Sequence, residues 1–355
     1  MNKIERLRSK FDQLGIYGML ITNNSNRRYL TGFTGSAGIV ILTYSKAILI
    51  VDFRYVEQAQ SQVRDFEILE VKDSQLLVNE ILTVSKDLSL ASLGFEQHHV
   101  NFHFYNQLKE NVGAELVPLS GIVEELRMVK DKDEISKMRT AAEIADDAFL
   151  SILNYIHPGV TELEVANELE LQMRKRGASS SAFDMIIASG VRSALPHGAP
   201  TSKVIETGDM VTLDFGAYYQ GYRSDMTRTI AVGQPDEKLC GIYTIVHEAL
   251  ERQVTGIKPG ISGRDADALS RDFITQMGFG EKYGHGSGHG VGLDIHESPF
   301  MSTRCNDVIT EGMVLTVEPG IYIPKLGGVR IEDEILVREN SNEILTKSPK
   351  EFISL

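Results

Sequence analysis

The C-terminal part of this chain contains two strand–turn–strand patterns, each carrying two acidic side chains. The first is VTLDFGAYYQGYRSDMTRT, which includes Asp214 and Asp225, and the second runs from MVLTVEP to VRIEDEILV, which includes Glu318 and Glu332. His289 lies between the two patterns, in GHGSGHGVG. Four carboxylates and one imidazole suit a pair of hard divalent cations. The sequence therefore predicts that these five residues form a metal site.

The first pattern predicts a register that brings two carboxylates together. If Gln220 and Gly221 form the turn of a hairpin, Asp214 lies opposite Thr227, and Asp225 projects from the same face two residues earlier. Carboxylates held this close raise each other's pKa unless a cation neutralises them. The hairpin geometry therefore favours a bound metal.

The second pattern is interpreted as a strand over MVLTVEP, a glycine-rich turn over GIYIPKLGG and a returning strand over VRIEDEILV. Charged and apolar residues alternate along the returning strand, with Arg330, Glu332 and Glu334 set against Val329, Ile331 and Ile335. Glu332 is therefore expected to point away from the apolar side, beside Arg330.

These segments together resemble one enzyme family, the pita-bread metallopeptidases, and within it the branch of aminopeptidase P and prolidase, which cleaves Xaa-Pro bonds. The resemblance covers residues 126 to 355 and rests on SGVRSALPHG, the DFGA run, SDMTRT, HGVGLDIHE, GMVLTVEPGIY and GVRIEDE, in the family's order. NRRYLTGFTGSAGIV and VDFRYVEQA are similar to the smaller N-terminal domain of that branch.

The resemblance implies two domains: an α/β N-terminal domain of the creatinase/prolidase type over residues 1–125, and an α+β pita-bread (creatinase/aminopeptidase-like) catalytic domain over 126–355. The residue pattern agrees, because GMLIT, AGIVILT and KAILIVDF are short apolar strands that alternate with helices. A lysine-rich linker then leads into a long helix that we expect to end at Pro158–Gly159. A second helix is predicted from a Thr161 to Glu164 capping box to Gly177, and further helices near 237–256 and 262–277.

The resemblance also implies two divalent metal ions per chain, with manganese the first expectation and cobalt or zinc the alternatives. Asp225 and Glu332 would bridge the two ions, Asp214 would bind one of them, and His289 with Glu318 would complete the other. A pair of ions of this kind activates a water and polarises the scissile carbonyl.

Four residues carry the implied catalytic roles. Glu318 would shuttle the proton from the water to the leaving nitrogen. His296, seven residues after His289, would hydrogen-bond the substrate or the tetrahedral oxyanion. His197, in LPHG, would orient the substrate, and Arg330 would hold Glu332 by charge-assisted hydrogen bonds.

The expected activity is that of a proline-directed hydrolase, an Xaa-Pro aminopeptidase that removes the N-terminal residue before proline. The alternative is an Xaa-Pro dipeptidase (prolidase), and the second alternative is a non-catalytic pita-bread domain that binds peptides or proteins. A dipeptidase must recognise a free carboxylate just after proline, for which Arg304 is a candidate unless it is a solvated loop charge. Arg304 and Tyr322 are the candidates for substrate binding.

Composition narrows the location and the partners. The chain has 355 residues, of which 42% are hydrophobic, and a formal net charge of −13. This negative charge argues against binding to nucleic acid or to an anionic membrane surface. Cys240 and Cys305 form no metal-type pair, and the charged start is not a signal peptide, so we expect a cytoplasmic protein with reduced thiols. The resemblance implies proline-containing peptide substrates and a homodimer or larger homo-oligomer.

Three other features are interpreted as structural. GIVILTYSKAILIV is interrupted by Ser45 and Lys46 and is therefore a strand pair, not a membrane span. His98, His99 and His103 are expected to belong to an ordinary packed helix. Asp52 is predicted to cap the helix that follows its strand.

Overall fold

The computed structural model describes residues 2–72 and 77–355, and the chain divides into two compact units, Met1–Arg127 and Met128–Leu355. The N-terminal unit is an α/β domain with a six-stranded mixed sheet in the order β4-β3-β2-β1-β5-β6. Its strands are β1 (Gly18–Ile21), β2 (Ile39–Thr43), β3 (Ala47–Asp52), β4 (Glu67–Val71), β5 (Ser92–Glu96) and β6 (Glu115–Leu119). Its helices are α1 (Lys3–Arg8), α2 (Phe11–Leu14), α3 (Asn24–Thr31), α4 (Val56–Gln62), α5 (Leu77–Asp87), α6 (Phe102–Asn111) and α7 (Ile122–Met128).

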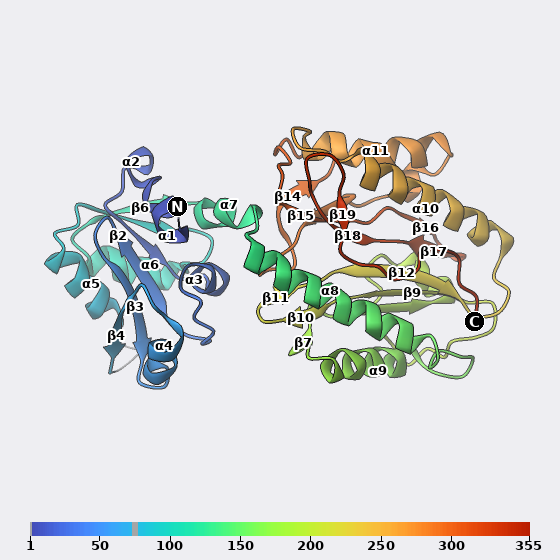
Figure 1. The fold of residues 1–355 in the computed structure, drawn as a ribbon, viewed down its shortest axis with the longest axis horizontal. Coiled ribbons are helices and arrows are strands. Elements are labelled where there is room, and N and C mark those ends of the chain that lie inside the picture. The colour runs from blue at the N-terminus through green and yellow to red at the C-terminus, as the bar shows by residue number, and fades with distance from the viewer. Residues whose placement is uncertain (1, 73–76) are drawn as a thin grey trace. The chain divides into compact units, whose positions relative to one another are not determined.

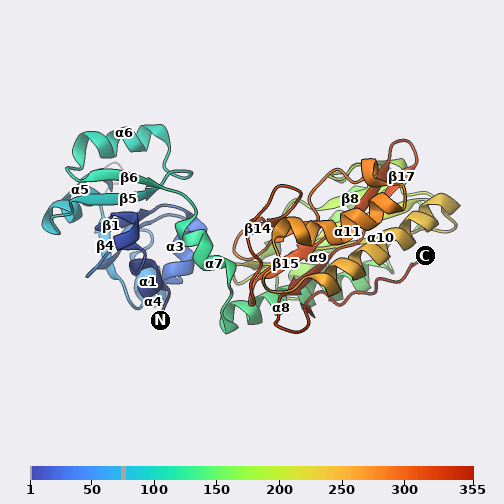
Figure 2. The ribbon, with the colours of Figure 1, turned by 90° about the horizontal axis from the view of Figure 1, so that it is seen from above.

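Helices cover both faces of this sheet, and Figure 2 shows α6 on one side and α1 with α4 on the other. Strands β1 and β2 are therefore buried along their whole length, as expected for strands that are packed on both faces. The predicted strand pair is confirmed, because β2 and β3 are antiparallel neighbours with Ile41 opposite Ile48.

The C-terminal unit has an α+β architecture of four long helices and several small sheets. The helices are α8 (Lys132–Ile152), α9 (Glu162–Lys175), α10 (Glu237–Gly256) and α11 (Gly263–Gln276). The strands are β7 (Ser180–Ser181), β8 (Ile186–Ser189), β9 (Met210–Phe215), β10 (Ala217–Tyr219), β11 (Tyr222–Arg223), β12 (Met226–Ala231), β13 (Gly288–Gly290), β14 (Glu297–Met301), β15 (Val314–Val317), β16 (Gly320–Ile323), β17 (Gly327–Arg330), β18 (Asp333–Leu336) and β19 (Glu343–Ile344). Short 3₁₀ turns are formed by Gly190–Ala194 and Gly280–Lys282.

Two apolar cores lie on opposite sides of the strands. One packs α8 and α9 against β8, β9 and β12, and the other packs α10 and α11 against β15, β17 and β18. Figure 1 shows the strands between these two pairs of helices. The strands bearing the acidic residues are therefore held from both sides.

The predicted start of α9 is confirmed, because Thr161 and Glu164 form the reciprocal capping box. The helices expected near 237–256 and 262–277 are α10 and α11. The predicted end of the preceding helix at Pro158–Gly159 is wrong. Helix α8 ends at Ile152, because the chain then tightens into turns in which Tyr155 N–H donates to the carbonyl of Ile152.

The glycine-rich segment GIYIPKLGG is not a simple turn, which corrects our interpretation. It folds into a hairpin of its own, β16 paired with β17, with Tyr322 opposite Gly328. Lys325 adopts a positive φ of 69° at the tip of this hairpin. The strand predicted over VRIEDEILV is consequently two strands, β17 and β18, and Glu332 lies in the break between them.

Two N-terminal predictions also need correction. Asp52 does not cap α4, because that helix begins at Val56 and the Asp52 carboxylate instead accepts hydrogen bonds from the Arg54 backbone and guanidinium. His99 precedes α6, so it does not share a helix with His103. His99 Nε2 lies 2.7 Å from Asn23 Nδ2, a contact in keeping with a structural role.

Among the described residues, no helix combines the length and the apolar character that crossing a membrane requires.

Candidate metal centre and its cavity

A cavity of about 510 Å³ lies in the C-terminal unit. All five predicted metal ligands line it, and so do all four predicted catalytic residues, one of which, Glu318, belongs to both groups. These residues are Asp214, Asp225, His289, Glu318 and Glu332, with His197, His296 and Arg330. The structure thus brings together side chains that lie up to 135 residues apart in sequence.

The first acidic hairpin has the predicted register. Thr227 on β12 pairs with Asp214 on β9, and Gln220 and Gly221 form the turn with positive φ values of 48° and 93°. Asp225 immediately precedes β12 and lines the cavity beside Asp214. A local turn therefore brings two carboxylates to one site.

The second acidic pair comes from strands β15 and β18, which are antiparallel neighbours with Val317 opposite Asp333. Glu318 follows β15 and Glu332 precedes β18, so both carboxylates stand at the same end of this strand pair. The two halves are joined directly, because Thr227 Oγ1 donates to Glu332 Oε2 at 2.6 Å.

Three of the predicted ligands form one compact group. One donor atom each from Asp225, His289 and Glu332 lies within 4.8 Å of the others. His289 Nε2 is 3.7 Å from Asp225 Oδ2 and 3.5 Å from Glu318 Oε1. His289 Nδ1 faces the carbonyl of Gly290 at 3.0 Å, which can only accept a hydrogen bond, so Nε2 carries the lone pair toward the cavity.

The carboxylates of this cluster are buried close to one another. Burial, followed by the neighbouring carboxylates, raises the pKa of Asp225 and of Glu332 well above the usual range. Burial raises the pKa of Glu318 to about 7 and lowers the pKa of His289 to about 4. Buried Asp214 Oδ1 has no hydrogen-bond partner within the described protein. Carboxylate oxygens with one neutral imidazole therefore fit divalent metal ions.

Arg330 connects the two halves behind the cavity. Its Nη2 donates to Asp214 Oδ2 at 2.6 Å, and its Nε donates to Thr227 Oγ1 at 3.1 Å. Its Nη1 donates to the hydroxyl of Tyr322 at 2.7 Å. Arg330 thus does not make the direct hydrogen bond to Glu332 that we predicted, because two of its nitrogens bond Asp214 and Tyr322. The link is indirect: Arg330 bonds Thr227, and Thr227 bonds Glu332.

His285 was missed by the sequence analysis, although it stands in the same GHGSGHGVG segment as His289. Its Nδ1 faces the carbonyl of Gly286 at 2.7 Å, so its Nε2 accepts from the Tyr322 hydroxyl at 2.8 Å. Burial lowers the pKa of His285 to about 4. A neutral imidazole with a defined tautomer therefore lines the cavity, 3.8 Å from the Glu318 carboxylate.

The two predicted catalytic histidines lie at the open side of the cavity. His197 and His296 are both exposed, and the ring of His296 packs edge-on against His289 with centroids 4.5 Å apart. Burial, and then the nearby His197, lowers the pKa of His296 below its usual value. Both imidazoles can thus meet a ligand that enters from solvent.

The two candidates for substrate binding have different positions. Tyr322 is buried beneath the cavity and does not line it, and its hydroxyl bonds Arg330 and His285. Arg304 is exposed in the turn after β14 and also lies outside the cavity lining. An apolar wall that was not predicted from the sequence also lines the cavity, formed by Phe183, Met185, Ile186, Ile295 and Phe300.

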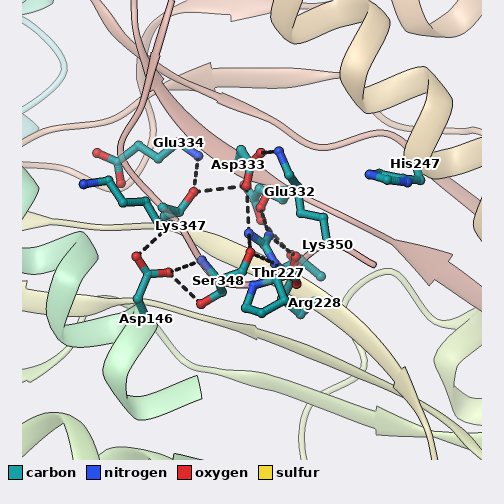
Figure 3. Close-up of polar contacts among 12 residues, drawn as sticks. Asp146, Thr227, Arg228, His247, Glu332, Asp333, Glu334, Lys347, Ser348 and Lys350 are labelled. Carbon is teal, nitrogen blue, oxygen red and sulfur yellow. Dashed lines mark hydrogen bonds and ion pairs between the residues drawn. The ribbon is translucent and has the colours of Figure 1, made fainter. Parts of the chain in front are cut away.

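A buried polar cluster surrounds the backbone next to Glu332, one of the predicted ligands (Figure 3). The guanidinium of Arg228 donates to the carbonyls of Thr227 and Glu332 and to the carboxylate of Asp333. The same guanidinium donates to the carbonyl of Ser348 in the C-terminal segment. All of its contacts are buried or nearly so, and the backbone around Glu332 is therefore tightly held.

Comparison with known proteins places this geometry in a family. Residues 136–339 match the model of metallopeptidase family M24, and residues 3–129 match the creatinase/prolidase N-terminal domain. The chain is similar to the solved structure of an Xaa-Pro dipeptidase from Bacillus anthracis, with 56% identity, 99% of each chain covered and a TM-score of 0.98.

Two further relatives have different activities in their names. An Xaa-Pro dipeptidase from Pyrococcus horikoshii is 40% identical, over 99% of this chain and 98% of the relative. The structure of an X-Pro aminopeptidase from Thermotoga maritima is 38% identical over the whole of both chains, with a TM-score of 0.92. The predicted pita-bread fold and the predicted resemblance are confirmed. This chain is an enzyme of metallopeptidase family M24 that carries a creatinase/prolidase-type N-terminal domain.

Proposed function

We propose that this enzyme is a dinuclear-metal Xaa-Pro dipeptidase, which hydrolyses the bond between an N-terminal residue and a following proline. The observation that carries the proposal is the convergence of Asp214, Asp225, His289, Glu318 and Glu332 on one cavity. The similarity to dipeptidases at 56% and 40% identity supports the choice of substrate.

In this proposal Asp214, Asp225, His289, Glu318 and Glu332 would hold two divalent ions. The set of donors is rich in carboxylate oxygen, which favours manganese, with cobalt or zinc as alternatives. The chemistry supplied by such ions is polarisation of the scissile carbonyl and activation of the attacking water. Arg330 keeps Asp214 in place through its 2.6 Å hydrogen bond.

Glu318 is the proposed proton carrier. Its carboxylate stands at the cavity, and burial raises its pKa to about 7, which suits a group that takes a proton and returns it near neutral pH. Glu318 accepts the proton of the attacking water and delivers it to the proline nitrogen as the bond breaks. His296 donates a hydrogen bond to the developing oxyanion, and His197 orients the substrate.

Proline is accommodated by shape. An Xaa-Pro bond is a tertiary amide without an N–H, so the site needs no acceptor for it and must instead receive the pyrrolidine ring. The apolar wall that includes Phe183, Ile295 and Phe300 provides such a surface beside the metal ligands.

A second candidate function is that of an Xaa-Pro aminopeptidase, which acts on longer peptides. One observation favours it: Arg304, the candidate for binding the free carboxylate of a dipeptide, is exposed and outside the cavity lining. The similarity to an X-Pro aminopeptidase at 38% identity supports this second candidate function as well.

The test uses paired peptides with proline or alanine at the second position, assayed with metal-free enzyme before and after addition of Mn²⁺. We expect hydrolysis of the proline series alone, and only after Mn²⁺ is added. Equal turnover of the alanine series would refute proline specificity, and full activity of demonstrably metal-free enzyme would refute the metal mechanism.

A further inference from the structure

The loop that carries His197 is closed at both ends by one buried carboxylate. This loop, residues 190–200, follows β8 and includes the 3₁₀ turn Gly190–Ala194. The Glu162 side chain is fully buried, and its Oε1 accepts the N–H and the hydroxyl of Ser189, directly before the loop, at 2.8 and 2.9 Å. Its Oε2 accepts the N–H and the hydroxyl of Thr201, directly after the loop, at 3.0 and 2.7 Å. One side chain therefore joins the two ends of the loop.

Arg192 connects Glu162 to the part of the loop next to His197. Its Nε donates to Glu162 Oε2 at 3.0 Å, and its Nη2 donates to the carbonyl of Ala199 at 2.6 Å. The N–H of Ala199 in turn donates to the carbonyl of His197 at 2.9 Å. The guanidinium is therefore held by Glu162 and fixes the backbone two residues after His197.

The loop packs closely against β8 and forms one wall of the cavity. A Cβ atom placed on Gly198 would lie only 2.7 Å from the Cβ atom of Ala188, so glycine is required for this approach. Pro196, His197 and Ala199 line the cavity together with the predicted metal ligands. The position of this wall thus depends on the anchors of the loop.

The partners of Glu162 require a carboxylate. The backbone N–H groups of Ser189 and Thr201 can only donate, and so can the Nε of Arg192. A glutamine side chain presents one oxygen and one NH₂ group, so in either orientation its NH₂ group faces one of the two backbone donors. Glu162→Gln therefore keeps the size of the side chain, while one end of the loop loses its acceptor.

We propose that Glu162 is a positioning residue that holds the loop of His197 against the cavity, directly at both ends and through Arg192 in the middle. This inference rests on the proposed function, because it takes His197 to orient the substrate. Glu162 lies outside the cavity lining. It is the first residue of α9, which packs on β8 and β9 in an apolar core, so its carboxylate stands on a rigid base.

The test is a double-mutant cycle between Glu162→Gln and His197→Ala, assayed on an Xaa-Pro peptide with Mn²⁺-loaded enzyme. We expect Glu162→Gln to lower kcat/KM at least about tenfold, with the content of bound metal unchanged. In the His197→Ala background the same change should cost less than about twofold, since the group that Glu162 positions is already absent.

Hydrogen exchange of the Mn²⁺-loaded protein gives a readout that does not depend on activity. Backbone amides of residues 189–201 should exchange at least about tenfold faster in Glu162→Gln, because one anchor of the loop is lost. The amides of β9 and β12 should keep their wild-type exchange rates.

Arg192→Lys keeps the proposal testable if Glu162→Gln fails to fold. A single ammonium cannot bond both Glu162 and the carbonyl of Ala199, so we expect kcat/KM to fall at least about threefold, and to fall less in the His197→Ala background. The matched control is Arg176→Lys, which should leave kcat/KM unchanged. Arg176 is about as exposed as Arg192, at 27% against 25% of the side chain, and it bonds Gln172 and Ser151 on α9 and α8.

Three results would overturn the inference. Equal losses of kcat/KM from Glu162→Gln in the two backgrounds would show a general structural effect. Wild-type exchange of residues 189–201 in Glu162→Gln would show that the carboxylate does not hold the loop. A wild-type kcat/KM in Arg192→Lys would refute the action through Arg192. Faster exchange in Glu162→Gln together with a wild-type kcat/KM in His197→Ala would instead refute the proposed role of His197, and with it the premise of the inference.

Discussion

Arg330 donates a 2.6 Å hydrogen bond to Asp214 although 116 residues separate them. Both side chains are buried, and the contact ties β17 of the second acidic half to β9 of the first. A planar guanidinium reaches Asp214, Tyr322 and Thr227 from three of its nitrogens. The proposed metal ligands are therefore organised by a group that is not itself one of them.

Arg330→Lys tests this organisation. A single ammonium cannot keep the fork of contacts to Asp214, Tyr322 and Thr227, so we expect metal affinity to fall about 10- to 100-fold and kcat to fall with it. Metal titration of the apo protein followed by steady-state kinetics measures both effects. Arg338→Lys, which changes a more exposed arginine paired with Glu343, is the control. Wild-type affinity in Arg330→Lys would contradict the expectation.

Metal removal should lower stability as well as activity. Ions that bind the folded site raise the melting temperature by mass action, and their loss leaves the carboxylates of Asp225 and Glu332 facing each other without compensation. We expect chelation to lower the melting temperature and Mn²⁺ or Co²⁺ to restore it. A melting temperature independent of chelator and of added ion would rule out the proposed site.

Asp225→Asn and His296→Ala should differ in their content of bound metal, because we propose Asp225 as a metal ligand and His296 as a substrate-contacting residue. The asparagine variant should lose bound metal and activity together, because Asp225 belongs to the tight ligand group. The alanine variant should keep its metal and lose kcat by roughly 100-fold or more, as happens when an oxyanion donor is removed. Elemental analysis beside kinetics distinguishes them, and metal loss in His296→Ala would identify His296 as a ligand instead.

Substrate length separates the two candidate functions. A dipeptidase should hydrolyse free Xaa-Pro and reject both its C-terminal amide and Xaa-Pro tripeptides, since it recognises a carboxylate directly after proline. An aminopeptidase should cleave the tripeptides at least as efficiently as the dipeptide. Because Arg304 is exposed and outside the cavity lining, Arg304→Ala should leave KM for the dipeptide unchanged. A selective rise in that KM would place Arg304 at the substrate.

Glu334 should make the metal-free protein less stable as pH rises. Burial raises its pKa to about 8 from an ordinary value of 4.5, with Lys130 opposing the shift. Between these values the folded protein binds more protons than the unfolded chain, so the free energy of unfolding falls as pH increases. Glu334→Gln removes this titrating carboxyl group, and the glutamine side-chain carbonyl can still accept the N–H of Asp225. Its melting temperature should therefore rise by several degrees relative to wild type between pH 5 and pH 9.

The control for this pH dependence is Glu339→Gln, which alters an exposed carboxylate. Its melting temperature should follow that of the wild type at every pH. A constant offset between Glu334→Gln and wild type across the range would show that Glu334 does not titrate with the raised pKa.

Short-range patterns were sufficient to predict the first acidic hairpin. A turn at Gln220 and Gly221 leaves one register for the flanking strands, so the pairing of Asp214 with Thr227 could be predicted without knowledge of the rest of the chain. The same holds for the capping box of Thr161 and Glu164, whose partners lie three residues apart. The resemblance to a known family supplied the ligand set and the pita-bread fold, which local patterns alone do not specify.

The tertiary structure decided which polar groups face each other. Lys325 at a positive φ lets GIYIPKLGG become a hairpin, and this places Tyr322 between Arg330 and His285. The partner of His285 could not be predicted from a local pattern, because Tyr322 comes from a segment distant in sequence. The pKa shifts at the site depend on burial by two cores, and burial is a property of the assembled strands and helices.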